Sequence, residues 1–344
     1  MSHSTVPRSR TEADTTAKTP VASGGATGSS RKRRQGRLSL RLRIRRDRVL
    51  LLMTLPAVVL VLLFNYVPIL GNVVAFQDYD PYISDNGVVS MLHSPWVGLE
   101  NFQRIFADSS FWSAVQNTLV LFFLQLLLFF PIPILLALLI NSVVRPRVRA
   151  IAQAVLYLPH FFSWVLVIAV FQQLLGGAGL LSTLLRDHGY DGLDIMTDPN
   201  TFKFLVTAQS VWKDAGWGII VFLAALASVS PDLYEAAAMD GASRWRRMWH
   251  VTLPALRPVI ALLLVLRVGD ALTVGFEQIL LQRNAVGPGA AEVLDTFVWW
   301  NGVRNQDFGY AAAAGLVKGV ISIGLVLAAN KVAHLMGEQG VYKK

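Results

Sequence analysis

Three charged residues, Arg267, Asp270 and Glu277, interrupt an apolar stretch that covers residues 257–281. A charge at the centre of a bilayer costs about 2.5–3.5 kcal/mol on insertion scales, so such residues are rarely unpaired or in contact with lipid. At 100° per residue in a helix, their directions fall within about 80° of one another, which predicts one helix face that points away from lipid. Two interpretations stay open: Arg267 and Asp270 form an ion pair three residues apart, or the face lines a polar path.

The stretches that would position these charges are long and apolar. With 344 residues, 53% hydrophobic and 15% charged, the chain is too apolar for an ordinary soluble domain. A bilayer core about 30 Å thick needs roughly 20 helical residues. The sequence therefore predicts an all-α polytopic membrane protein with six transmembrane helices. Their expected positions are 49–75, 114–141, 151–175, 204–229, 257–281 and 308–334.

The basic residues are distributed unevenly among the connecting segments. The segments 1–48, 142–150, 230–258 and 335–344 hold 22 Lys and Arg, and the other three connections hold 5. Because cytoplasmic loops carry the excess of Lys and Arg, both termini are expected in the cytoplasm and the protein in the cell membrane, in contact with lipid. This orientation signal accounts for the pI near 10 without nucleic-acid binding.

The first 36 residues are rich in Ser, Thr, Gly, Arg and Lys and contain almost nothing that could enter a core. This composition predicts a disordered basic cytoplasmic tail at 1–36, followed by a membrane domain at 37–344.

Several kinds of chemistry have no visible residues in the sequence. There is no cysteine, so thiolate metal sites and cysteine nucleophiles are excluded. No Gly-Lys dipeptide occurs, so the chain has no phosphate-binding P-loop. The six histidines lack the spacing of a metalloprotease helix, and no Gly-x-Ser-x-Gly elbow is present. We expect no catalytic residue, no metal site and no cofactor bound by this chain.

Local helix signals are concentrated in the connection at residues 230–258, called here the coupling segment. Ser230 can cap a helix that starts at Pro231, and Gly241 can adopt the positive φ that ends it. Ser243 can cap a second short helix, which Leu253 and Pro254 are expected to stop before the fifth span. The pattern predicts two short helices that meet at a bend. From residue type alone, an interfacial helix pair on anionic lipid headgroups is an equal alternative.

The coupling segment resembles the EAA loop of permease subunits in binding-protein-dependent ABC importers. Eight positions match with the family's spacing: Glu235, Ala236, Ala237, Asp240, Gly241, Ala242, Leu253 and Pro254. The resemblance implies that Glu235 and the Ala236/Ala237 face contact a separate ATPase subunit, which binds ATP and Mg, and that Gly241 sets the bend angle.

Further blocks resemble the polysaccharide-type branch of carbohydrate-uptake permeases. They include Tyr157-Leu158-Pro159-His160-Phe161, Trp212-Lys213, Gly216-Trp217-Gly218, Gly275-Phe276-Glu277-Gln278 and Leu294-Asp295-Thr296. The resemblance implies uptake of an oligosaccharide delivered by an extracellular solute-binding protein, together with a second permease that is usually a different chain. Aromatic faces stack on the C–H surfaces of sugars, and charged groups meet their hydroxyls. The candidate lining of the sugar path is therefore Trp212, Lys213, Asp214, Trp217, Arg267, Asp270 and Glu277.

Two other functions compete with this interpretation. A membrane enzyme for lipid-linked sugars could use Asp270 or Glu277 as an acid or base, and it would be active without an ATPase. A proton-coupled secondary carrier would depend on a proton gradient instead of ATP, although no internal repeat supports it.

Overall fold

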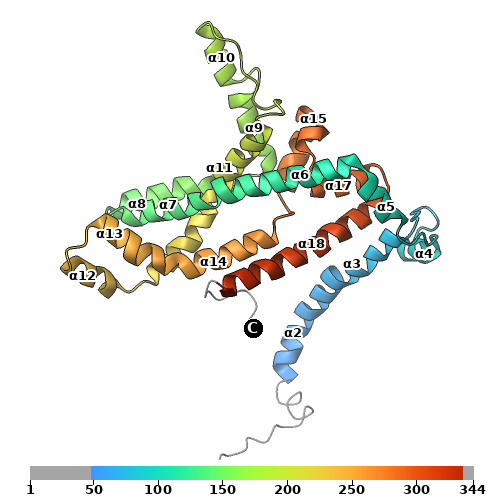
Figure 1. Ribbon diagram of the computed structural model, residues 1–344, viewed down its shortest axis with the longest axis horizontal. Helices are drawn as coiled ribbons and strands as arrows, with labels where there is room; N and C mark the ends of the chain where they lie inside the picture. Colours follow the sequence, from blue (N-terminus) through green and yellow to red (C-terminus); the bar gives the residue numbers. More distant parts are fainter. Residues whose placement is uncertain (1–47, 336–344) are drawn as a thin grey trace, which may run out of the picture. The chain divides into compact units, whose positions relative to one another are not determined.

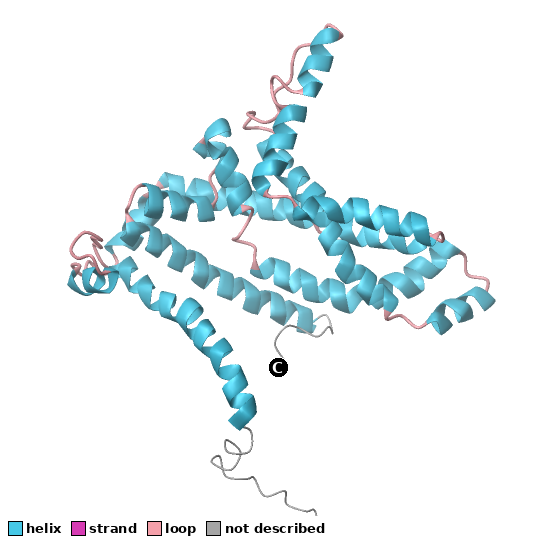
Figure 2. Cartoon of the chain, turned by 180° about the vertical axis from the view of Figure 1, so that it is seen from behind, coloured by secondary structure: helices cyan, strands magenta, loops and turns pink. Residues whose placement is uncertain are grey.

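The computed structural model describes residues 48–335, and no β-strand occurs among them (Figures 1 and 2). The chain divides into two compact units after Leu62. Helix α2 (Arg48–Val61) belongs to the first unit, and the elements from α3 onward belong to the second. The predicted disordered tail at 1–36 lies outside the described residues.

The second unit is a series of helices joined by turns and loops. In its first half these are α3 (Val67–Leu70), α4 (Gly87–His93), α5 (Glu100–Ala107), α6 (Ser109–Leu124), α7 (Pro131–Ser142), α8 (Pro146–Tyr157), α9 (Trp164–Leu175) and α10 (Leu180–Asp187). In its second half they are α11 (Phe202–Ala227), α12 (Pro231–Met239), α13 (Arg244–Arg247), α14 (Leu253–Gly269), α15 (Phe276–Val286), α16 (Pro288–Ala291), α17 (Leu294–Trp299) and α18 (Phe308–Leu335).

Six helical stretches of the described part are long and apolar enough to cross a membrane. They are Arg48–Phe76, Ser109–Ser142, Trp164–Asp187, Phe202–Ala227, Arg244–Gly269 and Phe308–Leu335. The all-α class and the six transmembrane helices predicted from the sequence are confirmed. The predicted limits of the third and fifth spans are wrong, and both errors bear on the functional site.

The third span does not begin at residue 151. Helix α8 ends at Tyr157, a 3₁₀ turn (η4, Leu158–Phe161) follows, and a new helix starts at Trp164. Ser163 caps that helix by accepting a hydrogen bond from the Leu166 N–H at 3.3 Å. The capping side chain offers the backbone an alternative to a continuous α-helix, so the chain breaks at η4.

The fifth span does not extend to residue 281. Helix α14 ends at Gly269, and Asp270 occupies its C-cap. Gly275 has φ 59°, in the left-handed region, and α15 starts at the next residue. The expectation that Arg267, Asp270 and Glu277 share one helix face is therefore wrong, because the helix that would align them stops before Asp270.

Helix α11 packs against most of the elements that build the site, namely α6, α7, α8, α9, α14, α15, η4 and the π-helical turn η3 (Gln125–Phe129). It approaches the end of α8 closely at Gly216, where a Cβ would overlap the carbonyl oxygen of Leu156. Glycine is needed there because any side chain would push the two helices apart. Apolar side chains fill the space between α7, α11 and α14. The buried members of this core are Ala137, Ile140, Ile219, Phe222, Leu223, Leu226 and Leu256.

Three buried glutamines hold α15 against α11. The Gln278 amide donates to Gln209 Oε1 at 2.7 Å, and the Gln282 amide donates to the same oxygen at 3.0 Å. Buried amides are stable only when they are hydrogen-bonded, so this network fixes the position of α15 after the turn at Gly275.

The outer ends of α6 and α18, as oriented by the sequence, are joined by Asp108. Its carboxylate caps α6 through the Ser110 N–H at 2.7 Å and accepts from the Tyr310 hydroxyl at 2.6 Å. Partial burial opposes ionisation of Asp108, but these hydrogen bonds outweigh burial and hold its pKa below the ordinary value.

Candidate functional site

The coupling segment folds as the local sequence signals predict at its first helix and its bend. The Ser230 hydroxyl accepts a hydrogen bond from the Asp232 N–H at 3.3 Å, and Pro231 starts α12. Asp240 follows the last helical residue, and Gly241 has φ 72°. The Ser243 hydroxyl then accepts from the Arg246 N–H at 3.3 Å and caps α13. The predicted first helix, the bend at Gly241 and the cap at Ser243 are confirmed.

The expected stop at Leu253 and Pro254 is wrong. Helix α13 continues through a π-helical turn (η5, Met248–Thr252) into α14. The Leu253 N–H bonds to the carbonyl oxygen of Met248, five residues back. A proline lacks the N–H of a normal turn and clashes with the carbonyl four residues before it, and a wider π turn just before Pro254 accommodates both effects. One helical stretch therefore runs from Arg244 to Gly269.

Helix α12 presents an open surface. None of its residues is buried, Glu235 and Ala236 are exposed, and Ala237 is half-buried. Figures 1 and 2 both show α12 clear of the other helices at one end of the second unit. The Tyr234 hydroxyl lies 3.2 Å from the Thr252 hydroxyl and ties α12 back to η5. The bend and this contact together hold the open face of α12 in a defined position.

A second group of polar side chains lies where η4 meets the middle of α11. The Lys213 ammonium is buried and donates to the His160 carbonyl oxygen at 2.7 Å. It also lies 5.5 Å from the centre of the Trp164 ring. Of the candidate path residues, Lys213 is thus engaged by the protein itself. The Lys213 ammonium gives a hydrogen bond to the His160 carbonyl, which lies in η4, where the regular hydrogen bonds of an α-helix are interrupted.

Asp214 and Trp217 both contact the imidazole of His160. His160 Nδ1 lies 2.9 Å from Asp214 Oδ1, and the His160 and Trp217 rings stack with centroids 4.7 Å apart and planes 12° apart. The Asp214 side chain is 34% exposed and Trp217 is 53% exposed. These four residues, His160, Lys213, Asp214 and Trp217, are called the α11 cluster. Its open surface combines an indole face with a carboxylate.

Trp212 lies apart from the other three candidates on α11. It packs against Phe162 and Phe171, with ring centroids 6.4 and 5.8 Å away. Five residues at 100° each place Trp217 about 140° around the helix from Trp212. The structure therefore separates the two tryptophans that the sequence grouped in one patch.

Arg267 has a partner other than the one expected. Among residues 48–335 no ion pair joins it to Asp270. Its guanidinium donates instead to the Gln125 side chain and lies 5.8 Å from the centre of the Phe129 ring. The Arg267–Asp270 ion pair, one of the two interpretations that the sequence left open, is therefore wrong as a direct contact.

Asp270 and Glu277 are both exposed, but on different elements. Asp270 follows the last residue of α14, where the negative end of the helix dipole disfavours an acid. Glu277 lies in the first turn of α15. The dipole of α15 favours an acid at that end, so Asp270 is the exposed carboxylate that does not stabilise its own helix, and it is the stronger candidate for contact with a ligand.

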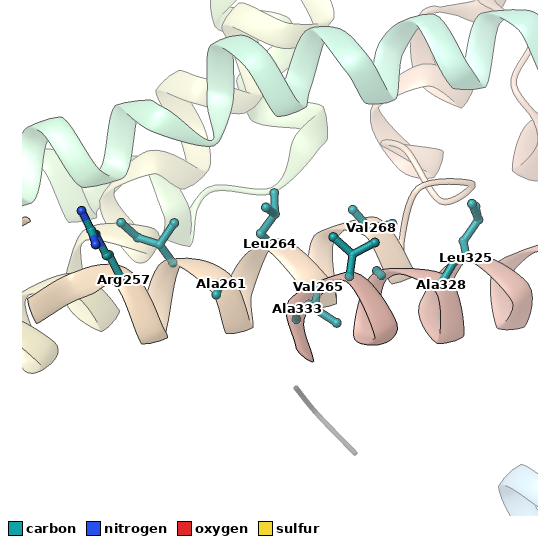
Figure 3. Close-up of a pocket in the computed structure, with 11 residues that line it drawn as sticks. Arg257, Ala261, Leu264, Val265, Val268, Leu325, Ala328 and Ala333 are labelled. Atoms are coloured by element: carbon teal, nitrogen blue, oxygen red, sulfur yellow. The ribbon is translucent and has the colours of Figure 1, made fainter. Parts of the chain in front are cut away.

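The groove between α14 and α18 has a different character. It encloses about 630 Å³, and Figure 3 shows its lining, in which Arg257 is the one charged residue. The other ten lining residues are Ala, Val, Leu or Ile. Apart from Arg257, such a surface offers no polar side chain to sugar hydroxyls, so we place the candidate sugar site at the α11 cluster instead.

The chain resembles known transport proteins over nearly its whole length. The model of the family described as "Binding-protein-dependent transport system inner membrane component" matches residues 129–335. The chain belongs to this family. It is 41% identical over 326 residues to the polygalacturonan/rhamnogalacturonan transport system permease YteP of Bacillus subtilis, covering 94% of this chain and 100% of that protein. It is 39% identical to the protein LplB of the same organism, covering 87% and 92%.

Solved structures agree with this assignment. The chain superposes on a chain of a bacterial alginate ABC transporter, solved with an alginate pentasaccharide-bound periplasmic protein, with a TM-score of 0.79 and 36% identity, covering 88% of this chain and 99% of that one. The protein is thus a multi-pass permease of the inner membrane and not itself an enzyme. The matched range contains the coupling segment, the α11 cluster and Arg267, Asp270 and Glu277.

His160 is the site residue that the sequence analysis did not single out. A histidine ahead of an apolar run has no distinctive spacing, and its partners Asp214 and Trp217 lie more than fifty residues away. Within residues 48–335, no group of three or more His, Asp or Glu side chains is placed to hold a metal.

Proposed function

We propose that this permease forms, with a second permease of different sequence, the membrane path for an oligosaccharide or polysaccharide fragment. An extracellular binding protein delivers the glycan, and two separate ATPase subunits drive its passage. The observation that carries the proposal is the α11 cluster, because it places an open carboxylate and an open indole at the middle of a membrane-spanning helix.

The position of the α11 cluster argues against contact with lipid. Helix α11 has 26 residues, and Asp214 lies at its centre, in the depth of the bilayer core. An ionisable side chain there faces a cavity or a protein partner. Trp217 supplies an apolar face of the kind on which sugar rings stack, and Asp214 supplies acceptors for hydroxyls.

The opposite wall of the proposed path comes from the end of α14. Arg267 lies in its last turn, and Asp270 follows three residues later at an exposed position. Glu277, exposed in the first turn of α15, is the remaining acidic candidate for the path. Trp212 and Lys213 do not form the open surface of the path. They stabilise the helix behind it, Trp212 by packing against Phe171 and Lys213 by donating to the His160 carbonyl oxygen.

The substrate class follows from relatives with closely similar chains. YteP is named for polygalacturonan and rhamnogalacturonan. A second similar structure, 37% identical with a TM-score of 0.78, is that of a bacterial ABC transporter involved in the import of the acidic polysaccharide alginate. Glycan fragments that contain uronic acids are therefore the first substrates to test. The Arg267 guanidinium is a basic group beside this path that could attract their carboxylates.

The coupling segment is the proposed contact with the ATPase. Its open α12 carries Glu235 with Ala236 and Ala237, and Gly241 turns the chain back towards the membrane. Asp240, Ala242, Leu253 and Pro254 complete the segment. A charged, exposed helix on a fixed bend can enter a groove of a partner and move with it as a rigid lever.

Uptake of radiolabelled uronic-acid oligosaccharides tests the proposal. Cells that lack this chain should lose uptake and regain it with the wild-type gene, and the uptake should require ATP. The Asp270→Asn variant should change the uptake rate or glycan preference while the ATPase still copurifies. Uptake that continues without ATP but collapses with the proton gradient would refute the proposal in favour of a secondary carrier.

A further inference from the structure

We propose that His160 is a positioning residue that sets Asp214 and Trp217 for sugar contact, and that it thereby determines which glycans the path prefers. This inference rests on the proposed function, because it assumes that the glycan passes along α11. It adds a residue that does not itself need to bind the sugar.

The backbone of His160 is held in place before its side chain acts. Its carbonyl oxygen accepts a hydrogen bond from the buried Lys213 ammonium at 2.7 Å. Gly216 lets α11 lie directly against the end of α8, next to η4. Because both anchors come from α11, the imidazole keeps a fixed distance from that helix.

One imidazole then controls two side chains. Its Nδ1 lies 2.9 Å from Asp214 Oδ1, and its ring plane is within 12° of the Trp217 ring. With the proton on Nδ1, His160 donates to Asp214. Within the described part of the chain, the contacts of Asp214 with His160 and Lys213 both use Oδ1, which leaves Oδ2 to a ligand.

The contacts also fix the direction of the indole. A tryptophan with 53% exposure can otherwise change rotamer, and a sugar would have to order it on binding. The stack on His160 holds the second face of Trp217 open to the path. A prepared indole and carboxylate select sugars by shape, so the effect should appear in preference between glycans.

The test uses two variants that separate the two contacts. His160→Phe retains a ring for Trp217 but removes the donor to Asp214, whereas His160→Gln retains a donor but removes the ring. His188→Gln is the matched control, because His188 is exposed in another loop and contacts the Leu184 carbonyl oxygen of its own helix.

The measurement is the ratio of maximal uptake rates for two glycans in proteoliposomes that contain the whole transporter and saturating binding protein. One glycan is an oligogalacturonate, and the other is the same oligomer with its carboxyls reduced. Saturation removes the preference of the binding protein from the ratio. Loss of a hydrogen bond to a charged group should change the ratio about tenfold in His160→Phe, with partial recovery in His160→Gln.

The outcomes are distinct. A ratio within twofold of wild type in His160→Phe overturns the inference, whether both rates fall together, as a purely structural role predicts, or neither changes. A shifted ratio in the His188→Gln control would equally overturn it. If the wild-type transporter carries neither glycan with ATP present, the proposed function fails instead.

Discussion

Gly241 offers a direct test of the coupling segment, because its backbone conformation can be made costly without any steric clash. It has φ 72°, and a Cβ built on it meets no atom within 4 Å. A substitution there therefore costs backbone strain alone. For an ordinary L-residue the left-handed region costs about 1–2 kcal/mol, and a β-branched residue fits it less well still.

The expected effect follows from that strain. A penalty of about 1–2 kcal/mol changes the population of the bent form relative to other forms by roughly 5–30-fold. We expect Gly241→Ala to reduce glycan uptake several-fold and Gly241→Val to abolish it, while the chain still inserts. Gly241→Asn should retain most uptake, because asparagine tolerates positive φ.

The assay compares uptake and glycan-stimulated ATP hydrolysis by the complete transporter. Gly189→Val is the matched control, since Gly189 has φ 82° and likewise no neighbour within 4 Å of a Cβ, but lies outside the coupling segment. Normal uptake and normal stimulation in Gly241→Val would refute the coupling role of the bend. Equal losses in Gly189→Val would show that strain at any such glycine harms the fold.

Three further predictions concern single charges. Glu235→Lys should abolish uptake and weaken ATPase copurification, because it reverses the charge on the open helix of the coupling segment. Glu292→Gln should lower the free energy of unfolding by about 3–5 kcal/mol, measured by thermal unfolding in detergent, since it removes the negative charge that faces the buried Arg283 guanidinium, whose Nε donates to Glu292 at 2.6 Å. The lowered pKa of Asp108 means that its ionised, hydrogen-bonded form stabilises the fold above pH 3.8, and that this contribution is lost as the pH falls from 3.8 through the lowered pKa. Asp108→Asn has no such carboxylate, so it should lack this part of the acid destabilisation seen in wild type.

Each of these changes has a control or a contrary outcome. Asp307→Asn breaks an ion pair with Arg104 at the same 2.6 Å, but on the surface, so it should cost less than about 1 kcal/mol. Equal destabilisation by Glu292→Gln and Asp307→Asn would contradict the burial argument. Wild-type ATPase binding by Glu235→Lys, or an unchanged acid transition in Asp108→Asn, would contradict the other two predictions.

The coupling segment was largely predictable from sequence because its determinants are local. Ser230, Pro231 and Ser243 act on backbone groups two or three residues away, and Gly241 acts through its own φ. The passage of the helix through Pro254 was not predictable, because it depends on the π turn at 248–252. A turn of that kind leaves no clear mark in residue type.

The end of the fifth span could not be found from hydropathy. Residues 271–281 remain largely apolar, so the apolar pattern in the sequence continues past Glu277. Helix α14 ends at Gly269, and the following turn contains Gly275 in the left-handed region. The position of α15 after this turn is held by the hydrogen bond from Gln278 to Gln209 on α11. Gln209 is 69 residues away from Gln278 in the chain, and the helical periodicity of apolar residues carries no information about so distant a partner.

The partner of Arg267 could not be predicted from the sequence either. The spacing of three residues favoured a local pair with Asp270, yet the guanidinium bonds to Gln125, 142 residues away. The π turn at Gln125–Phe129 brings both Gln125 and the Phe129 ring to Arg267. Tertiary contacts of this kind decide whether a membrane charge is paired, and they leave Asp270 exposed at the helix end.

The connectivity around the coupling segment gives the proposed mechanism a physical route. Helix α11 runs without interruption from the Asp214 and Trp217 region to Ala227, three residues before the cap of α12 at Ser230. On the other side, one helical stretch runs from Arg244 to Gly269 and carries Arg267 near its far end. Both walls of the proposed path are therefore continued by rigid helices to the two ends of the same short segment. Because a helix transmits displacement along its axis with little loss, a rotation of α12 within an ATPase groove would move the two walls relative to each other.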